Sequence, residues 1–426
     1  MQVDLPIPFT AKNLFTPATA GKTEGVAIIG CGIIGAMIAY ELAKTGVSVT
    51  VWEAQPEPAT GATGAALGLL MGVCSSKAKG DLVNLRLASL ARYDSLIREL
   101  EVLTGAEILY NRAGIVGVYA QGDQSKALSL AAIRQEQGFP LAVWDWAQLQ
   151  ELPGRWRGAY GVYSPADRAV HPGHLVQALV AGAKYYGAKF HWGTSIKDLQ
   201  AVLDGSLDGS AAQPNQKIVL TAGMGCNELL GNFLARRRGG TADGLAALQT
   251  EQTDALGLEE LLGKNLLKPV GGHGLRIRLP ALDFSLNNPD SNSSAVGQVI
   301  HMVMADGTDF NLVPLHHPDF APNEYWLGAT IEFDVDPDLS DFKLSSNSRS
   351  PDRWQWLLEQ AQEFSPWLAE AEVLSAWTGY RPRPANARSP ILGVLPEEPH
   401  ILLAMGHYRN GLLMAPITAQ LIRDLL

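Results

Sequence analysis

The stretch of residues 26–53 constrains the fold of this 426-residue chain more than any other part of the sequence. Four apolar residues, Val26–Ile29, lead into the turn Gly-Cys-Gly-Ile-Ile-Gly, and apolar residues then recur at helical spacing until Gly46. This pattern predicts a buried strand, a glycine turn and a helix. A second apolar strand, residues 47–52, ends at Glu53, eighteen residues after the last glycine of the turn.

Each glycine of the turn has its own physical role. Gly30 allows the tight turn, Gly32 lets the main chain approach a pyrophosphate, and Gly35 lets the helix pack closely on the strand. The first helical turn offers free N–H groups and a partial positive charge to phosphates. Glu53 can accept the ribose hydroxyls of an adenosine and repels a 2′-phosphate. The complete pattern predicts an adenine-dinucleotide site and leaves FAD and NAD as alternatives.

Composition and charge exclude several classes of protein. With 46% hydrophobic and 18% charged residues, the chain is globular, and its length suggests two or three domains. A net charge of −10 argues against a surface that follows nucleic acid. No apolar run has the ~18 residues of a spanning helix, so we expect no transmembrane segment. Cys31, Cys74 and Cys226 form neither a CxxC pair nor an even disulfide set, which favours a cytoplasmic location.

Apolar periodicity predicts the remaining elements. Small residues fill 54–72, which indicates that something bulky lies against this backbone. Residues 204–216 read as a polar hairpin, and residues 238–258 as an insertion. Helices are predicted for residues 81–103, 125–137, 146–152, 174–187 and 412–426. Strands are predicted for residues 108–119 (interrupted by Gly114 and Gly117), 158–163, 189–192, 217–223, 274–279, 299–304, 310–315, 325–332, 373–380 and 401–405. The later strands gather away from the parallel units, which predicts a second domain on a mostly antiparallel sheet.

Four pieces of the chain resemble the D-amino-acid oxidase family of flavoproteins, and within it the glycine oxidase branch. They are the amino-terminal unit, the small-residue segment, KIVLTAG at residues 217–223, and GHYRNGLLMAP at residues 406–416, which is the most specific piece. The resemblance runs from Thr23 to the last residue. It implies an α/β fold with a Rossmann-type FAD-binding domain, similar to that of glutathione reductase, and a second α+β substrate domain. The FAD-binding domain would comprise residues 1–105, 166–263 (with the insertion) and 381–426, and the substrate domain residues 106–165 and 264–380.

The resemblance also implies which residues contact FAD. The segment from His407 to Leu413 should border the flavin ring, with the positive end of the terminal helix aimed at the N1–C2=O edge. Covalently flavinylated relatives use a cysteine in the carboxyl-terminal half, and this chain has none after Cys226, so we expect non-covalent FAD, with a histidine linkage left open. The expected contacts are Gly30, Gly32, Ile33, Ile34, Gly35, Glu53, Ala54, Ala62, Thr63, Leu67, Gly68, Leu69, Ile196, Gly223, His407, Tyr408, Arg409, Asn410, Gly411, Leu412 and Leu413.

The same resemblance gives candidate substrate residues. Arg381, in Gly-Tyr-Arg-Pro, takes the place of the arginine that holds a substrate carboxylate as a two-point fork, and Arg409 should also lie in the active site. The spacing after Arg381 is about one residue off the family pattern, so Arg383 is the alternative. Asn311 stands where glycine oxidase has a tyrosine, which alters the pocket and puts glycine in doubt as substrate.

Three histidines near the second domain, His273, His316 and His317, are interpreted as solvated side chains rather than as a base or a metal site. No metal is expected.

The leading hypothesis is therefore oxidation of a small amine or amino acid, of the glycine, sarcosine or D-amino-acid type, to its imine by hydride transfer to flavin N5. The electron acceptor, O2 or a quinone or carrier, stays open, as does a homo-oligomer, which is common in the family. The alternative is a flavin-bound assembly or scaffold protein with a decayed substrate site. Asn311 and Leu315, which stands where the resemblance implies a basic residue, favour that alternative, whereas Arg381 and Arg409 disfavour it. An NAD-linked reductase ranks third.

Overall fold

The computed structural model describes most of the chain. The predicted insertion at residues 238–258, nearly all of the polar hairpin and the first 24 residues lie outside the described part. The described residues are 25–206 (except residue 123), 216–237, 266–280, 297–333, 351–385, 390–395 and 398–426.

A six-stranded sheet carries the glycine turn. Strand β1 pairs in parallel with β2 and β10, β10 pairs in parallel with β17, and only β16 runs antiparallel to its neighbour. This is the Rossmann-type arrangement that the sequence predicted. In spatial order the strands are β16 (Ile391–Leu395), β17 (Glu398–Met405), β10 (Lys217–Leu220), β1 (Val26–Ile29), β2 (Val49–Trp52) and β9 (Lys189–His191).

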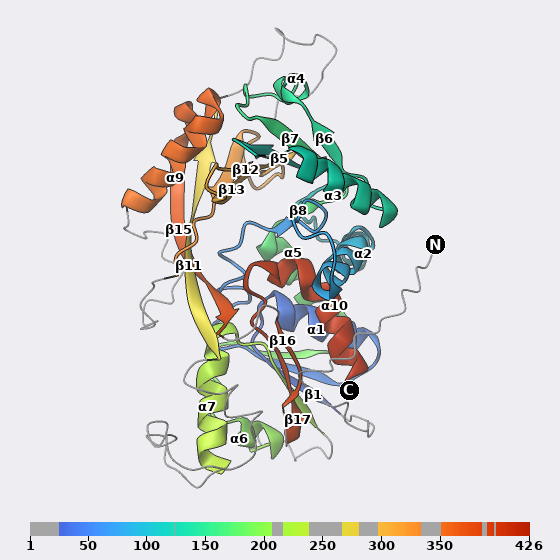
Figure 1. Cartoon of the computed structure of the whole chain (residues 1–426). Helices are drawn as coiled ribbons and strands as arrows, with labels where there is room; N and C mark the ends of the chain where they lie inside the picture. The colour runs from blue at the N-terminus through green and yellow to red at the C-terminus, as the bar shows by residue number, and fades with distance from the viewer. Residues whose placement is uncertain are drawn as a thin grey trace, which may run out of the picture.

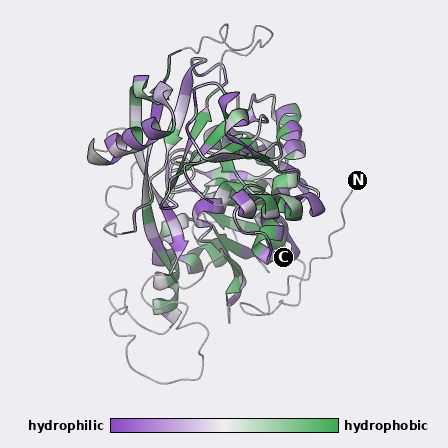
Figure 2. Ribbon diagram, turned by 45° about the horizontal axis from the view of Figure 1, so that its top comes forward, coloured by the Kyte–Doolittle hydropathy of each residue, from purple (hydrophilic) through white to green (hydrophobic). Residues whose placement is uncertain are grey.

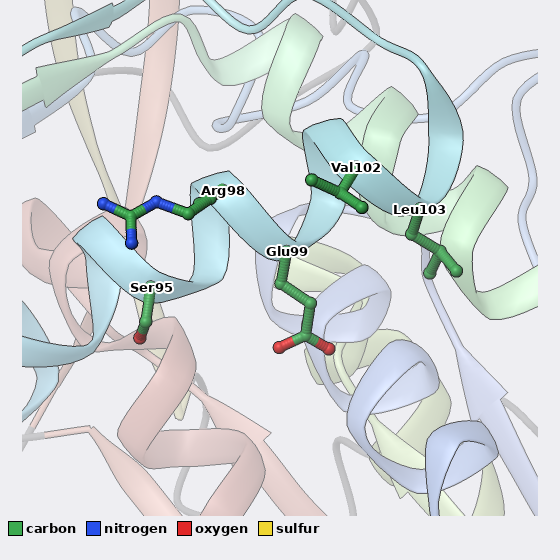
Figure 3. Close-up of a pocket in the computed structure, with 5 residues that line it drawn as sticks. All are labelled: Ser95, Arg98, Glu99, Val102 and Leu103. Atoms are coloured by element: carbon green, nitrogen blue, oxygen red, sulfur yellow. The ribbon is translucent and has the colours of Figure 1, made fainter.

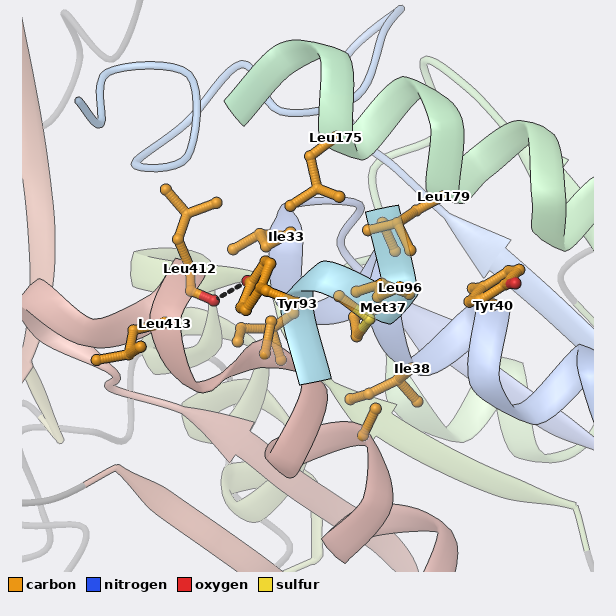
Figure 4. Packing of buried hydrophobic residues seen from close by; sticks show 14 of the residues in the cluster. Ile33, Met37, Ile38, Tyr40, Tyr93, Leu96, Leu175, Leu179, Leu412 and Leu413 are labelled. Carbon is orange, nitrogen blue, oxygen red and sulfur yellow. Dashed lines mark hydrogen bonds between the residues drawn. The ribbon is translucent and has the colours of Figure 1, made fainter. Parts of the chain in front are cut away.

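Four helices form a layer on one face of this sheet (Figure 1). Tyr93 of α2 is fully buried in this layer, and its hydroxyl donates a hydrogen bond to the carbonyl oxygen of Leu412 in α10 (Figure 4). A buried tyrosine hydroxyl needs such a partner, so this bond helps to fix the start of α10. The helices are α1 (Ile33–Lys44), α2 (Asp81–Thr104), α5 (Pro172–Tyr185) and α10 (Gly411–Asp424). Helices α6 (Leu199–Leu203) and α7 (Cys226–Arg237) pack on the opposite face.

An eight-stranded sheet forms the second large layer. Every neighbouring pair in it is antiparallel except β12 with β5, which confirms the predicted mostly antiparallel sheet. The strands in order are β15 (Glu372–Pro384), β11 (Leu267–Arg278), β14 (Glu324–Gly328), β13 (Asp309–Pro314), β12 (Val299–Val303), β5 (Ile115–Tyr119), β7 (Tyr160–Ser164) and β6 (Ala142–Trp144).

The two faces of this sheet have different partners. Helix α9 (Pro351–Phe364), which the sequence reading missed, covers one face, where its Phe364 meets Phe310 edge to face. The other face contacts the small-residue segment and β8 (Arg168–Val170) through Val299, Val313 and Leu67. Successive side chains of β13 point to opposite faces of the sheet, so one set packs into the core under α9 and the other set faces the small-residue segment.

Several predicted boundaries change in the structure. Gly117 lies inside β5, so the prediction that it interrupts a strand is wrong, and β11 begins seven residues before the predicted strand at 274. The predicted domain boundaries stay predictions, although β15 continues past residue 380 to Pro384. Three further short strands, β3 (Leu69–Leu70), β8 and β4 (Tyr110–Asn111), make a small third sheet. Two helices, α3 (Gln124–Glu136) and α4 (Trp146–Gln150), complete the part beside β6.

Colouring by hydropathy places most hydrophobic residues in the central strands and helices (Figure 2). Among the described residues, no helix combines the length and apolar character needed to cross a membrane.

Candidate active site

The glycine turn has a geometry that only glycine allows. Gly30 has a φ of +102°, in the region that L side chains avoid. A Cβ on Gly35 would lie 2.0 Å from the carbonyl oxygen of Gly30, so α1 packs directly on the turn. Gly32, the N-cap of α1, supplies no side-chain cap. The positive end of α1 is therefore open to an anion such as a pyrophosphate.

Glu53 stands beside this turn, just after β2. Its Oε2 accepts a hydrogen bond from the Cys31 N–H at 2.6 Å, and its Oε1 accepts one from the Gln55 N–H at 2.9 Å. Thr63, from the small-residue segment, accepts the Ile33 N–H at 3.1 Å. Three predicted cofactor residues thus converge on the start of α1, where an adenosine ribose and a pyrophosphate would fit.

The start of α10 lies beside the start of α1. A Cβ on Gly411, the first residue of α10, would lie 3.8 Å from Cγ2 of Ile33, the first residue of α1. Asn410, the N-cap of α10, makes no side-chain cap, so this helix end is open as well. Just before it, His407 is buried, and its Nε2 lies 2.9 Å from Thr418 Oγ1. Neither N-cap residue provides a side-chain cap, although Thr63 accepts the first N–H of α1, and two such helix N-termini side by side suit an anionic dinucleotide with an electron-accepting ring.

The small residues at 54–72 are explained by close packing against the eight-stranded sheet. A Cβ on Gly379 would lie 2.2 Å from the Ala65 Cβ, and the Trp377 indole N–H donates to the Ala65 carbonyl oxygen at 3.0 Å. Gly68 has a φ of +80°, and a Cβ there would lie 1.9 Å from the Val170 carbonyl oxygen. The segment is therefore held between the eight-stranded sheet and β8 of the small third sheet.

The other predicted cofactor residues are distributed over these elements. Ile196 is buried in the core cluster that contains Trp52, and Gly223 follows β10 with a φ of +57°. Ala54 is exposed and Ala62 is half-buried. Leu67, Leu412 and Leu413 are buried, Leu69 lies in β3, and Tyr408 has a φ of +54°.

Arg381 lies on the face of the eight-stranded sheet that contacts the small-residue segment. Its Nη1 donates to the carbonyl oxygens of Gly271 at 2.9 Å and Thr330 at 3.1 Å. Burial, and then the positive charge of Arg409, lower the pKa of Arg381. Its other N–H groups have no partner among the described residues, so they are available to a carboxylate.

The other two candidate arginines are placed differently. Arg409 forms a two-point ion pair with Asp309, and 38% of its side chain is exposed. Arg383 is exposed, with its guanidinium carbon 5.5 Å from the centre of the Phe333 ring. Arg381 is thus the more buried of the two alternatives for the carboxylate.

Asn311 is buried, and both the oxygen and the nitrogen of its amide are bonded to protein groups. Its amide bridges His301 Nδ1, at 2.9 Å from Oδ1, and the carbonyl oxygen of Gly328, at 3.2 Å from Nδ2. Burial lowers the pKa of His301. Sequence reasoning missed His301, although a histidine alternating with Val299 and Val303 in an apolar strand is an available signal for a buried polar site.

The interpretation of two histidines as solvated is wrong. His273 is buried, with its Nδ1 2.8 Å from Glu332 Oε1, and the side chain of His317 is only 8% exposed. His317, His174 and Asp319 offer three ligand atoms within 4.8 Å of one another, where no metal was expected. The Leu109 N–H, however, donates to His174 Nδ1 at 3.4 Å. An imidazole that binds a metal through Nε2 carries a proton on Nδ1, so this contact argues against a metal at His174. His316 is exposed.

A hollow on α2 is unrelated to these groups. Figure 3 shows its lining residues, which all come from this one helix: Ser95, Arg98, Glu99, Val102 and Leu103.

Comparison with known proteins agrees with this geometry. The family model described as DAO, FAD dependent oxidoreductase, matches residues 25–425. The chain therefore belongs to the FAD-dependent oxidoreductases of this family, and FAD is its cofactor. The open helix ends, Glu53 and the glycine turn fit that group, whose chemistry when bound is to accept a hydride or electrons.

Several relatives named as glycine oxidases match more than nine tenths of the chain. Glycine oxidase of Geobacillus kaustophilus is 25% identical over 405 residues, covering 94% of this chain and 92% of that protein. The bifunctional protein ThiO/ThiG of Synechocystis is 28% identical over 95% of this chain. This chain spans about half, 52%, of that bifunctional protein's length.

Solved structures show the same fold. The crystal structure of the Geobacillus kaustophilus glycine oxidase superposes with a TM-score of 0.71 at 24% identity, covering 94% of this chain and 93% of the other. That of iminodiacetate oxidase from Chelativorans gives 0.67 at 20% identity, covering 94% of each chain.

Proposed function

We propose that this protein oxidises a small amino acid or amine, of the glycine, sarcosine or D-amino-acid type, to its imine. The observation that carries the proposal is the half-buried guanidinium of Arg381, directed over Gly272 on the face that meets the small-residue segment. Relatives named as glycine oxidases along the whole chain support it.

Each residue group has a separate task in this reaction. Arg381 binds the substrate carboxylate through its unpaired N–H groups, which fixes the α-carbon relative to the bound flavin. Arg409, held by Asp309, adds positive charge at the same end of the sheet. The open ends of α1 and α10 hold the anionic parts of FAD. Positioning of this kind supplies most of the rate that such a site can offer.

The finer assignments belong to the same proposal. FAD is bound without a covalent cysteine link, and the electron acceptor is O2 or a quinone or carrier; a homo-oligomer, common in the family, stays open. A cytoplasmic location is consistent with Cys31, Cys74 and Cys226, which are all free thiols.

The alternative is a flavin-bound scaffold protein without a working substrate site. Asn311 and Leu315 raise this alternative from the sequence, but both are buried, and Asn311 is bonded within the sheet. Desolvating the guanidinium of Arg381 costs free energy unless an anion or other acceptors compensate. A binding role for Arg381 accounts for that cost, and a decayed site does not.

Anaerobic titration of the purified protein tests the proposal. Its visible spectrum is recorded, and glycine, sarcosine, D-amino acids and L-amino acids are then added one at a time without oxygen. Bleaching of the flavin band by one of these amines is the expected result. A flavin that stays oxidised with all of them would support the scaffold alternative instead. Release of the yellow chromophore by acid tests non-covalent binding in the same samples.

A further inference from the structure

His301 lies in the middle of the sheet face that carries the candidate substrate site. In the strand register it stands between Gly117 of β5 and Asn311 of β13, and Asn311 in turn stands opposite Gly328 of β14. The two polar side chains are therefore flanked on both sides by glycines. Neighbouring side chains lie over both glycines: a Cβ on Gly117 would lie 3.0 Å from the Tyr119 ring, and a Cβ on Gly328 would lie 3.2 Å from Leu67 of the small-residue segment.

The hydrogen bonds of this row determine the proton positions on His301. The Gly328 carbonyl oxygen can only accept, so the Asn311 amide must direct its NH2 group to it. The Asn311 carbonyl oxygen then faces His301 Nδ1 at 2.9 Å and can only accept as well. Nδ1 therefore carries the proton, and Nε2 of the neutral ring presents a lone pair.

This lone pair has no protein partner among the described residues. Among the described residues, two fully enclosed side-chain atoms lack a hydrogen-bond partner, Arg86 Nε and His317 Nε2. His301 Nε2 is not one of them, so this unpaired atom is not fully enclosed by protein. His301 as a whole is 6% exposed. An acceptor at the edge of a nearly buried site is placed to meet the donor of a small ligand. The charged groups around it are Asp309, Arg409 and Asp167.

We propose that His301 binds the nitrogen of the substrate, with Nε2 accepting a hydrogen bond from an N–H of the neutral amine. This inference rests on the proposed function. Arg381 binds the carboxylate and His301 the nitrogen, so two ends of the substrate are fixed. An amine that donates an N–H keeps its own lone pair for the C=N bond that forms on oxidation. Asn311 acts through His301 as a positioning residue, because it sets the tautomer.

Substrate specificity follows from this arrangement. Primary and secondary amines have an N–H when neutral, whereas a neutral tertiary amine has none. A site with an unpaired buried acceptor rejects a ligand that lacks the matching donor. Sarcosine should therefore reduce the flavin much faster than N,N-dimethylglycine.

The test compares these two amines in anaerobic stopped-flow reduction of the FAD-loaded protein. In the wild type we expect a second-order rate constant at least about tenfold higher for sarcosine. In His301→Leu we expect the sarcosine value to fall about tenfold or more and the ratio to approach one. His301→Gln, which can offer a carbonyl oxygen, should recover part of the ratio. The matched control is His316→Leu, which replaces an exposed histidine and should keep the wild-type ratio.

Contrary outcomes separate the two levels of the inference. If His301→Leu retains bound FAD and the wild-type ratio, His301 does not bind the amine, while reduction by sarcosine still supports the proposed function. If no amine of the panel reduces the wild-type flavin, both proposals are wrong. If His301→Leu fails to fold, Asn311→Leu decides the question, because loss of tautomer control should lower the ratio, and an unchanged ratio would contradict the role of His301.

Discussion

The guanidinium of Arg381 lies directly over Gly272, in the space that the Cβ of any other residue at position 272 would occupy. A Cβ on Gly272 would lie 2.4 Å from Nη1 and 2.6 Å from Nη2 of Arg381. The neighbouring Gly271 and Thr330 carbonyl oxygens hold Nη1 from the same side. The guanidinium of Arg381 thus packs against the backbone of β11.

Replacing Gly272 by alanine should displace Arg381 without touching the glycine turn that binds FAD. We expect flavin content to stay at the wild-type level and the second-order rate constant for flavin reduction by the best amino acid to fall about tenfold or more. A lost hydrogen bond to a charged group costs about 1.5–3 kcal/mol, which corresponds to that range. Anaerobic stopped-flow reduction measures it.

Gly297→Ala is the matched control, since the nearest atom to a Cβ there is the Ala113 Cβ at an ordinary 3.7 Å. This variant should behave as the wild type. Wild-type kinetics in Gly272→Ala would mean that Arg381 has no role in substrate binding.

Lysine replacements distinguish Arg381 from Arg383. A lysine keeps the charge but cannot make the planar two-point contact with a carboxylate. We expect Arg381→Lys to raise the KM for an amino acid by about 10- to 100-fold. Arg383→Lys should change it less than about threefold, because Arg383 is exposed and stacked over Phe333. The reverse order of effects would assign the carboxylate to Arg383.

Asp167 fixes the end of the small-residue segment to the β7–β8 turn. Its fully buried carboxylate accepts backbone N–H groups of Gly72, Val73 and Cys74 at 2.7–2.8 Å. Burial raises the pKa of Asp167, although these hydrogen bonds oppose the rise. Asp167→Asn turns an NH2 group toward N–H donors, so we expect about 1–3 kcal/mol less stability in urea unfolding.

The control for this substitution is Asp306→Asn. Asp306 also accepts a backbone N–H, from Thr308, but it is exposed, so we expect a loss under about 0.5 kcal/mol. Equal losses in the two variants would contradict a special role for Asp167.

Buried His407 and half-buried His171 predict how stability depends on pH. Burial lowers the pKa of His407 to about 3, and burial followed by the charges of His174 and His317 lowers that of His171 to about 3. Both groups have an ordinary pKa near 6.5 when unfolded. Below that pH the unfolded chain takes up protons that the folded chain excludes, so stability is full above pH 6.5 and is lost as the pH falls toward 3. The slope should be about 1.4 kcal/mol per pH unit for each histidine.

Urea unfolding at several pH values between 7.5 and 4.5 measures this slope. His407→Asn should lower it by the contribution of one histidine, about 1.4 kcal/mol per pH unit. A slope that is the same in the variant would show that His407 is protonated equally in the folded and unfolded chains.

Much of the fold could be predicted from local pattern. A continuous apolar run predicted β1, and helical spacing of apolar residues predicted α1, α2 and α3 to within a few residues, because these patterns are local to each element. Helix α9 was missed although Leu357, Ala361 and Phe364 follow helical spacing. The length of β11 was missed because its glycines weaken a strand pattern, and those glycines are explained only by Arg381 and Trp377 packing over them.

The sequence by itself determined the dinucleotide site, since the glycine turn, the helix start and Glu53 are contiguous and their chemistry is local. Only the tertiary structure decided how the substrate end is built. His301, Asn311, Gly328 and Arg381 come from four strands, and what each does depends on register: which carbonyl oxygen faces an amide, and which glycine leaves room for a guanidinium. Register is fixed by pairing between segments far apart in the chain, and no local pattern of residues records it.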